Sequence, residues 1–248
     1  MLTRFFQRIE EKEKDCRQPP VLTVAFGDSA TQGCMECDVI AHSSVYHHLL
    51  KQMLENAYPK STFSMLNAGV SGDTAAKSLD RLDRDVIRHD PALVIVGFCL
   101  NDSLKKSNGM AEYAASMNTI LDRIAAETSA DVILLTSNFM ATRATGRIHP
   151  THRCFTELMT GCQNDGVVSA YNAEIRKIGE TRGLPVADVY ARWEYMASEG
   201  VDTTALLSNG LNHPDAAGQR LIAEAIWNVI SRNAPLADSS NNPICINE

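Results

Sequence analysis

Four short polar motifs in this chain contain the residue types that ester hydrolysis requires. Gly27-Asp28-Ser29 supplies a hydroxyl, Asn101-Asp102 a side-chain amide, Asn212-His213-Pro214 an imidazole, and Asn67 to Thr74 two glycines. A serine hydroxyl becomes nucleophilic only when a nearby base takes its proton, and N–H groups can stabilise the oxyanion that its attack creates. Taken singly, each motif is equally typical of a turn or a helix cap, so their combination carries the information.

Three of these motifs follow segments with the length and composition of β-strands. The apolar runs are Val21–Phe26, Thr62–Leu66, Leu93–Phe98, Val132–Thr136 and Leu184–Val189. Amphipathic helical periods separate them, at residues 45–54, 75–86, 113–124, 168–178 and 221–230. This alternation predicts a parallel sheet with helices on both faces, and chemistry at the carboxyl ends of its strands. Residues 93–96 lack polar alternation, which predicts a strand that is covered on both faces.

Length and composition favour a single globular domain with no nucleic-acid partner. The 248 residues carry a formal charge of −7, whereas phosphate binding needs a basic face. We expect a core at about 21–231, an N-terminal extension at 1–20 and a loose tail at 234–248. The first 16 residues are charged and lack the apolar region of an export signal, and no apolar run reaches the ~20 residues of a membrane span. The seven scattered cysteines are then most simply reduced thiols, which indicates a cytoplasmic protein. The oligomeric state is not indicated.

Together, the four motifs resemble those of the SGNH (GDSL-type) hydrolase superfamily, in the same order along the chain. The resemblance implies a three-layer, flavodoxin-like α/β/α sandwich and hydrolysis of a small-molecule ester or thioester without metal or cofactor. It implies Ser29 as nucleophile and His213 as general base. The oxyanion donors would be the backbone N–H groups of Ser29 and Gly72 and the side chain of Asn101, with Gly69 as the alternative glycine. The neighbouring carboxylates, Asp28 and Asp102, would support the site.

The chain departs from the family pattern in two motifs. The glycine of the third motif is Gly97, two positions earlier than the pattern places it. Three residues before His213, where the pattern has an aspartate, stands Gly210, preceded by Asn209. Three interpretations remain: Asn209 orients the imidazole, another carboxylate such as Asp202 does so, or the site is degenerate. We favour Asn209, because its side-chain oxygen can accept the Nδ1 proton of the ring.

The sequence therefore predicts a serine esterase that cleaves a small carboxylic ester, for instance an O-acetylated carbohydrate. The alternatives are a weak or inactive relative that binds an acylated or carbohydrate ligand, and a thioesterase or lysophospholipase. A phosphate- or nucleotide-binding protein of flavodoxin type would leave the serine, amide and imidazole unconnected.

Other groups of reactive residues carry weaker signals. Cys34 and Cys37 lack the second pair that a zinc site needs, and His47 and His48 point apart on a helix. The long segment Met140–Gly166 carries Arg143, Arg147, His149, His152 and Arg153. It is either a solvated basic loop or a lining of the substrate pocket that binds an anionic group.

Overall fold

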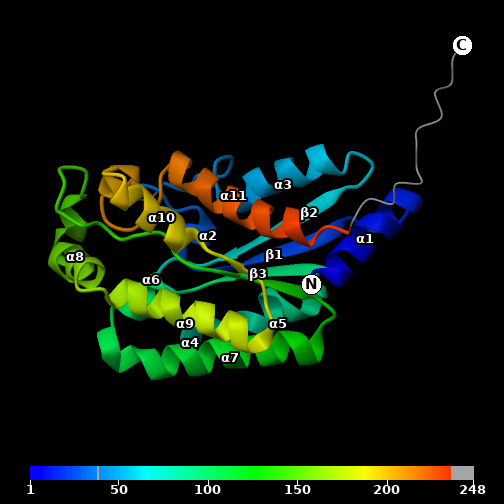
Figure 1. Cartoon of the computed structure of the whole chain (residues 1–248), viewed down its shortest axis with the longest axis horizontal. Helices are drawn as coiled ribbons and strands as arrows, with labels where there is room; N and C mark the ends of the chain where they lie inside the picture. Colours follow the sequence, from blue (N-terminus) through cyan, green and yellow to red (C-terminus); the bar gives the residue numbers. More distant parts are fainter. Residues whose placement is uncertain (38, 236–248) are drawn as a thin grey trace, which may run out of the picture.

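The computed structural model describes residues 1–37 and 39–235. Five parallel strands form one sheet in the order β2-β1-β3-β4-β5. They are β1 (Val21–Gly27), β2 (Phe63–Gly69), β3 (Leu93–Gly97), β4 (Asp131–Leu135) and β5 (Val186–Ala187). Helices cover both faces of the sheet (Figure 1), which confirms the predicted three-layer sandwich. The strand order is that of flavodoxin-like folds.

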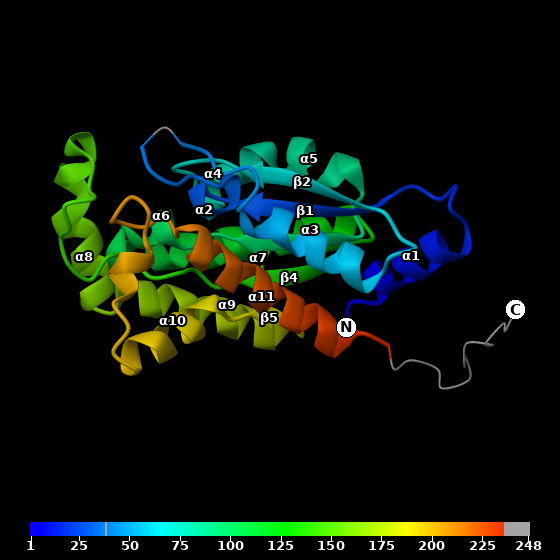
Figure 2. The ribbon, with the colours of Figure 1, turned by 90° about the horizontal axis from the view of Figure 1, so that it is seen from above.

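Each face of the sheet is covered by amphipathic helices whose apolar sides face inward. One layer consists of α3 (Tyr46–Ala57), α10 (Val189–Ser198) and α11 (Ala216–Asn233). The other consists of α4 (Ala75–Ser78), α5 (Leu82–Asp85), α7 (Met110–Glu127) and α9 (Val167–Arg182) (Figures 1 and 2). The stripe predicted at 113–124 is buried throughout in α7, and residues 93–96 of β3 are inaccessible on both faces. Burial of each such side chain stabilises the fold by about 1.5–3 kcal/mol.

The remaining elements are short helices and two peripheral ones. They are α1 (Thr3–Lys14), α2 (Ser29–Gln32), α6 (Leu100–Ser103), α8 (Thr156–Asn164), and the 3₁₀ turns η1 (Leu79–Arg81), η2 (Ile87–His89), η3 (Lys106–Gly109), η4 (Pro150–Phe155) and η5 (Thr203–Leu206). In Figure 2, α8 lies at one end of the molecule, beyond the carboxyl edge of the sheet, whereas α1 lies toward the other end.

Two predicted elements differ from the structure. The helical period at 75–86 is not one helix but α4, η1, α5 and η2 in succession. The break lies at the 3₁₀ turn that ends with Arg81, whose guanidinium is buried against the ends of two strands. The strand predicted at 184–189 keeps only two residues, because Pro185 has no N–H for pairing and the strand lies at the sheet edge.

The N-terminal segment belongs to the core rather than extending from it. Phe5 and Ile9 of α1 are buried, and the N–H of Phe5 donates to the Asp131 carboxylate of β4 at 2.8 Å. The predicted loose tail lies outside the described residues from position 236 onward. In the part of the chain that the structure describes, every helix is too short or too polar to cross a membrane.

Candidate active site

Three strand ends meet at the edge of the sheet where the sequence motifs were found. Gly27 of β1 pairs in register with Gly69 of β2 and with Gly97 of β3. A Cβ at Gly27 would lie 2.6 Å from the Gly97 carbonyl oxygen, so glycine permits this close approach. The residues that follow the three glycines therefore emerge side by side.

Ser29 begins a helix directly after β1. Asp28 caps this helix, α2, by accepting the Ala30 N–H at 2.9 Å. Ser29 is buried apart from 4% of its surface. Neither its N–H nor its hydroxyl forms a hydrogen bond with any residue in the described ranges. Both groups therefore remain available to a ligand.

The glycine-containing loop after β2 is held against α2. Val70 donates its N–H to the Gly27 carbonyl at 3.1 Å, and Ser71 donates its N–H to the Gln32 side chain at 2.8 Å. Gly72 follows with φ +75°, a backbone conformation that favours glycine, and it is exposed. Its N–H has no acceptor among residues 1–37 and 39–235. By contrast, the N–H of the alternative donor, Gly69, is already bound to the Asn67 side chain at 3.0 Å.

Asn101 brings a side-chain amide to the same loop. It lies in α6, which starts three residues after β3, and its Nδ2 donates to the Asp73 carbonyl at 2.8 Å. The amide carries two hydrogens, so one bond of this kind leaves the second for another acceptor. Asn101 is half-buried, and this hydrogen bond joins it to the residue that follows Gly72.

His213 reaches this edge from the loop before α11. Its Nδ1 lies 2.8 Å from the Met35 carbonyl oxygen, three residues after the end of α2. Gln219 of α11 donates to the Ala30 carbonyl at 3.0 Å. Two hydrogen bonds therefore join the segment that begins at Ser29 to the segment that begins at His213.

The Met35 carbonyl fixes the state of the ring. An acceptor at Nδ1 requires the proton on that nitrogen, so a neutral ring keeps the lone pair of Nε2. Met35 is itself held in a hairpin, where its N–H donates to the Val39 carbonyl at 2.9 Å. Burial lowers the pKa of His213, and the charge of His152 lowers it further, while the Met35 carbonyl raises it.

Asn209 does not contact the imidazole, so the expectation that it orients the ring is wrong. Its Oδ1 accepts the backbone N–H groups of Leu211, Asn212 and His213, each at 3.0 Å. It therefore shapes the loop that carries the imidazole. Asp202 is also engaged elsewhere, in an exposed ion pair with Arg143. The Met35 carbonyl occupies the position expected of the missing carboxylate, and a main-chain group has no side-chain signature in the sequence.

Two carboxylates lie behind the site. Burial raises the pKa of Asp28 to about 6 and that of Asp102 to about 7. The charge of Asp73 further opposes ionisation of Asp28, and the charge of Asp28 opposes ionisation of Asp102. Asp102 Oδ1 accepts the Ala75 N–H at 3.0 Å, whereas its Oδ2 is buried with no partner among the described residues. Both carboxylates thus support backbone turns next to the predicted donors.

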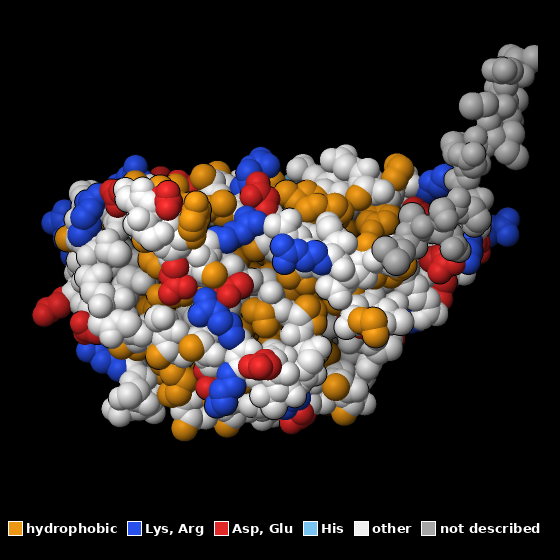
Figure 3. Space-filling model, in the orientation of Figure 1, with side chains coloured by type: hydrophobic (Ala, Val, Ile, Leu, Met, Phe, Trp, Pro, Cys, Tyr) orange, Lys and Arg blue, Asp and Glu red, His pale blue; other side chains and the backbone are white. Residues whose placement is uncertain are grey.

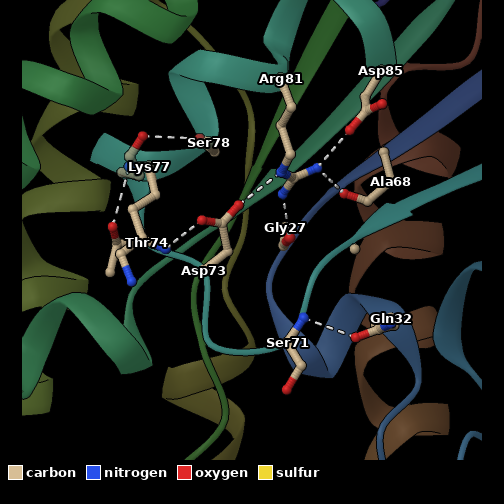
Figure 4. Close-up of polar contacts among 12 residues, drawn as sticks. Gly27, Gln32, Ala68, Ser71, Asp73, Thr74, Lys77, Ser78, Arg81 and Asp85 are labelled. Atoms are coloured by element: carbon tan, nitrogen blue, oxygen red, sulfur yellow. Dashed lines mark hydrogen bonds and ion pairs between the residues drawn. The ribbon is translucent and has the colours of Figure 1, made fainter.

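Arg81 is a site residue that the sequence analysis missed. Its buried guanidinium donates to the Gly27 carbonyl at 2.9 Å, the Ala68 carbonyl at 2.7 Å and the Asp73 carboxylate at 2.7 Å (Figure 4). It also lies 4.6 Å from the centre of the Phe26 ring. One side chain therefore ties the end of β1 to the end of β2 and to the loop that contains Gly72. The only signal in the sequence was an arginine within an apolar helical period.

Within the part of the chain that the structure describes, the other reactive side chains form no separate centre. Cys34 is buried with its pKa raised by burial, and burial lowers the pKa of His47 to about 4. His47 bonds the Thr31 carbonyl, while His48 bonds the Gln52 side chain. Within the described ranges, no group of three or more His, Cys, Asp or Glu side chains could hold a metal ion.

The fold is an α/β sandwich of the hydrolase type. A serine, an imidazole and amide groups lie at the carboxyl edge of its parallel sheet. The sequence model of the GDSL-like lipase/acylhydrolase family matches residues 25–221. The chain therefore belongs to this family of carboxylic ester hydrolases, as the motifs indicated.

Several solved structures share the fold. The acetylxylan esterase Axe2 from Geobacillus stearothermophilus has a TM-score of 0.66 and 19% identity, over 84% of this chain and 93% of its own. LAE5, an alpha/beta hydrolase enzyme from the metagenome of Lake Arreo in Spain, has a TM-score of 0.66 and 23% identity, over 87% and 97%. The acetyl xylan esterase AlAXEase has a TM-score of 0.66 and 19% identity, over 85% and 100%. No curated protein sequence is significantly similar to the chain.

Proposed function

We propose that the protein hydrolyses a small carboxylic ester, in particular an O-acetylated carbohydrate, with Ser29 as nucleophile and His213 as general base. The observation that carries the proposal is the 2.8 Å contact between His213 Nδ1 and the Met35 carbonyl. This contact supports a single tautomer of the imidazole, and it joins His213 to the segment that begins at Ser29. Two of the similar structures reported above are acetylxylan esterases by name, which favours an acetyl ester of a carbohydrate.

The proposed reaction has two stages. First, His213 Nε2 takes the Ser29 proton, and Oγ attacks the acyl carbon to give a tetrahedral intermediate. The N–H groups of Ser29 and Gly72 and the Asn101 amide would hold its oxyanion. His213 then returns the proton to the departing alcohol. In the second stage His213 activates water, which attacks the acyl-serine and releases the acid.

The proposed mechanism works without a carboxylate beside His213. In the serine-protease template, replacing the aspartate by asparagine costs about 10⁴ in turnover because the tautomer is wrong. The Met35 carbonyl supports the productive tautomer, so that part of the loss does not apply. A carbonyl dipole stabilises the imidazolium less than an anion does, and we expect a slower enzyme than one with a full triad.

Replacing Ser29 by alanine tests the proposal. We expect turnover of p-nitrophenyl acetate to fall by at least about 10³, the scale on which removal of a triad member acts. Ser71→Ala is the matched control, because Ser71 is an exposed serine in the neighbouring loop, and it should retain activity. Reaction of Ser29 with a fluorophosphonate should disappear in the same variant. Turnover by Ser29→Ala equal to that of the parent would refute the assignment.

A further inference from the structure

Residues 140–156, here called the basic arm, differ in charge from the rest of the molecule. The arm contains Arg143, Arg147, His149, His152 and Arg153 and no acidic residue, although the chain as a whole carries −7. On the face formed by α9, α10 and α11, by contrast, basic and acidic side chains are interspersed (Figure 3). Apart from the ion pair of Arg143 with Asp202, no carboxylate among the described residues pairs with the basic side chains of the arm.

The basic arm is fixed against the loop that carries His213. The Ala141 N–H donates to the Leu211 carbonyl at 2.6 Å. Gly210 faces the side chains of Thr145, Arg147 and Ile148 so closely that a Cβ there would lie 2.4 Å from the Thr145 hydroxyl. Ile148 is buried. These contacts hold residues 141–148 of the arm against Gly210 and Leu211, which lie three and two positions before the proposed general base in the same loop.

Two side chains of the arm that can bind an anion have no acidic partner among the described residues. Arg143 is paired with Asp202, and Arg147 donates to the Ala205 carbonyl. The exposed Arg153 contacts no carboxylate within residues 1–37 and 39–235. His152 is half-buried, and its interaction with His213 contributes to lowering the pKa of that imidazole.

The position of the arm determines which part of an ester it would contact. The imidazolium must lie within proton-transfer reach of the departing oxygen, so groups around His213 face the alcohol portion of the substrate. We propose that this alcohol portion carries a carboxylate or a phosphate, which His152 and Arg153 of the basic arm bind. This substrate class rests on the proposed esterase function of the same site.

Matched esters test the charge preference directly. The substrates are 4-acetoxybenzoate, 4-acetoxyphenyl phosphate and the neutral 4-acetoxybenzamide, with release of the phenol followed by chromatography. The measured quantity is the ratio of kcat/KM for each anionic ester to that for the neutral one. The double variant His152→Gln, Arg153→Gln should lower this ratio by about fivefold, since each solvent-accessible interaction with the anion contributes a factor of a few. The larger loss identifies the preferred anion, and 0.5 M salt should weaken the parent's preference.

The control removes an equal charge elsewhere. Arg88 is 71% exposed and precedes β3 at the opposite edge of the sheet, so Arg88→Gln should leave both ratios unchanged. Ratios in the double variant within about twofold of the parent's for both anions would overturn the proposal. A fall in the ratios that Arg88→Gln reproduces would overturn it as well.

A binding measurement separates this proposal from the esterase assignment. Calorimetric titration of the Ser29→Ala protein with 4-acetoxybenzoate and 4-acetoxybenzamide should show tighter binding of the anion, and the arm substitutions should abolish the difference. If the parent hydrolysed no ester but this preference persisted, the esterase assignment would fail and the anion site would stand. If the parent hydrolysed all three esters with no charge preference, the esterase assignment would stand and the anion site would fail. If the parent neither hydrolysed an ester nor preferred the anion in binding, both proposals would be refuted.

Discussion

Replacing Arg81 by methionine should destabilise the fold strongly, and more than replacing any other ion-paired residue near the site. The side chain of Arg81 is 10% exposed and that of its partner Asp73 is 7% exposed. Methionine keeps much of the apolar stem but leaves the Asp73 carboxylate and the carbonyls of Gly27 and Ala68 without their donor. Removing one partner of a buried ion pair costs about 3–5 kcal/mol, because a buried charge is left uncompensated.

This loss of unfolding free energy is large enough to measure by thermal and by urea denaturation. At about 2–4 °C per kcal/mol for a domain of this length, the midpoint of thermal unfolding should fall by about 6–20 °C. Urea denaturation should show the same loss of free energy with an unchanged slope. Arg84→Met is the matched control, because Arg84 pairs with the same Asp85 side chain but is 69% exposed. It should cost no more than about 1 kcal/mol.

The comparison also separates stability from positioning. At a temperature at which both variants are folded, Arg81→Met should lower kcat for a neutral acetyl ester, because the loop with Gly72 loses its tie to the end of β1. Arg81→Lys keeps the charge but not the forked geometry, and it should recover stability more than activity. If Arg81→Met and Arg84→Met lose equal free energy, the inference that the buried guanidinium holds the strand ends together is wrong.

Four further predictions follow from the same geometry. Burial lowers the pKa of His213 below its ordinary 6.5, so the acid limb of kcat/KM for a neutral ester should lie below pH 6.5; a limb above pH 7 would contradict this. Burial raises the pKa of Asp102 from 3.8 to about 7, so the folded state holds this proton more tightly than the unfolded state, and the free energy of unfolding falls as pH rises from about 4 to 7. Asp102→Asn should flatten that decline when the free energy is measured by urea denaturation. An equal decline in the variant would refute the prediction. Gly72 and Gly166 have φ of +75° and +76° with open space around them, so alanine at either position should cost about 1–2 kcal/mol, but only Gly72→Ala should also lower kcat/KM. Asn209→Asp retains an acceptor for the three N–H groups without reaching the ring, so it should not raise kcat/KM, and a tenfold gain would contradict the role assigned to the Met35 carbonyl.

Most of the fold could be predicted from the sequence because its patterns are periodic and local. The buried strand at 93–96 and the α7 stripe at 113–124 appear in the structure as expected. The helices α1, α8 and α10 were not predicted. The charged sequence of α1 obscured its buried side, Phe5 and Ile9, which becomes recognisable only when the sheet against which it packs is known.

The site was predictable where it consists of side chains in short motifs and not where it consists of main-chain groups. The motifs around Ser29, Gly72 and Asn101 do adjoin at one edge of the sheet, as their positions after successive strands indicated. The contact of Met35 with His213 spans 178 positions and involves a carbonyl that every residue possesses. No residue type marks such a contact, and the search for a side chain led to Asn209.

The distribution of charge around this edge explains how a histidine without a carboxylate partner can serve as a base. A neighbouring anion would raise the pKa of His213, whereas the buried position and His152 lower it, which favours the neutral ring that a general base requires. The acidic groups of the site, Asp28 and Asp102, lie instead behind the amide donors, where burial holds their pKa near neutrality. The basic arm, which is fixed against the loop that carries His213, adds positive charge that would attract an anionic alcohol. An ester that brings its own negative charge next to His213 would then supply part of the stabilisation that the missing carboxylate provides in a full triad, which links the unusual base to the substrate class inferred for it.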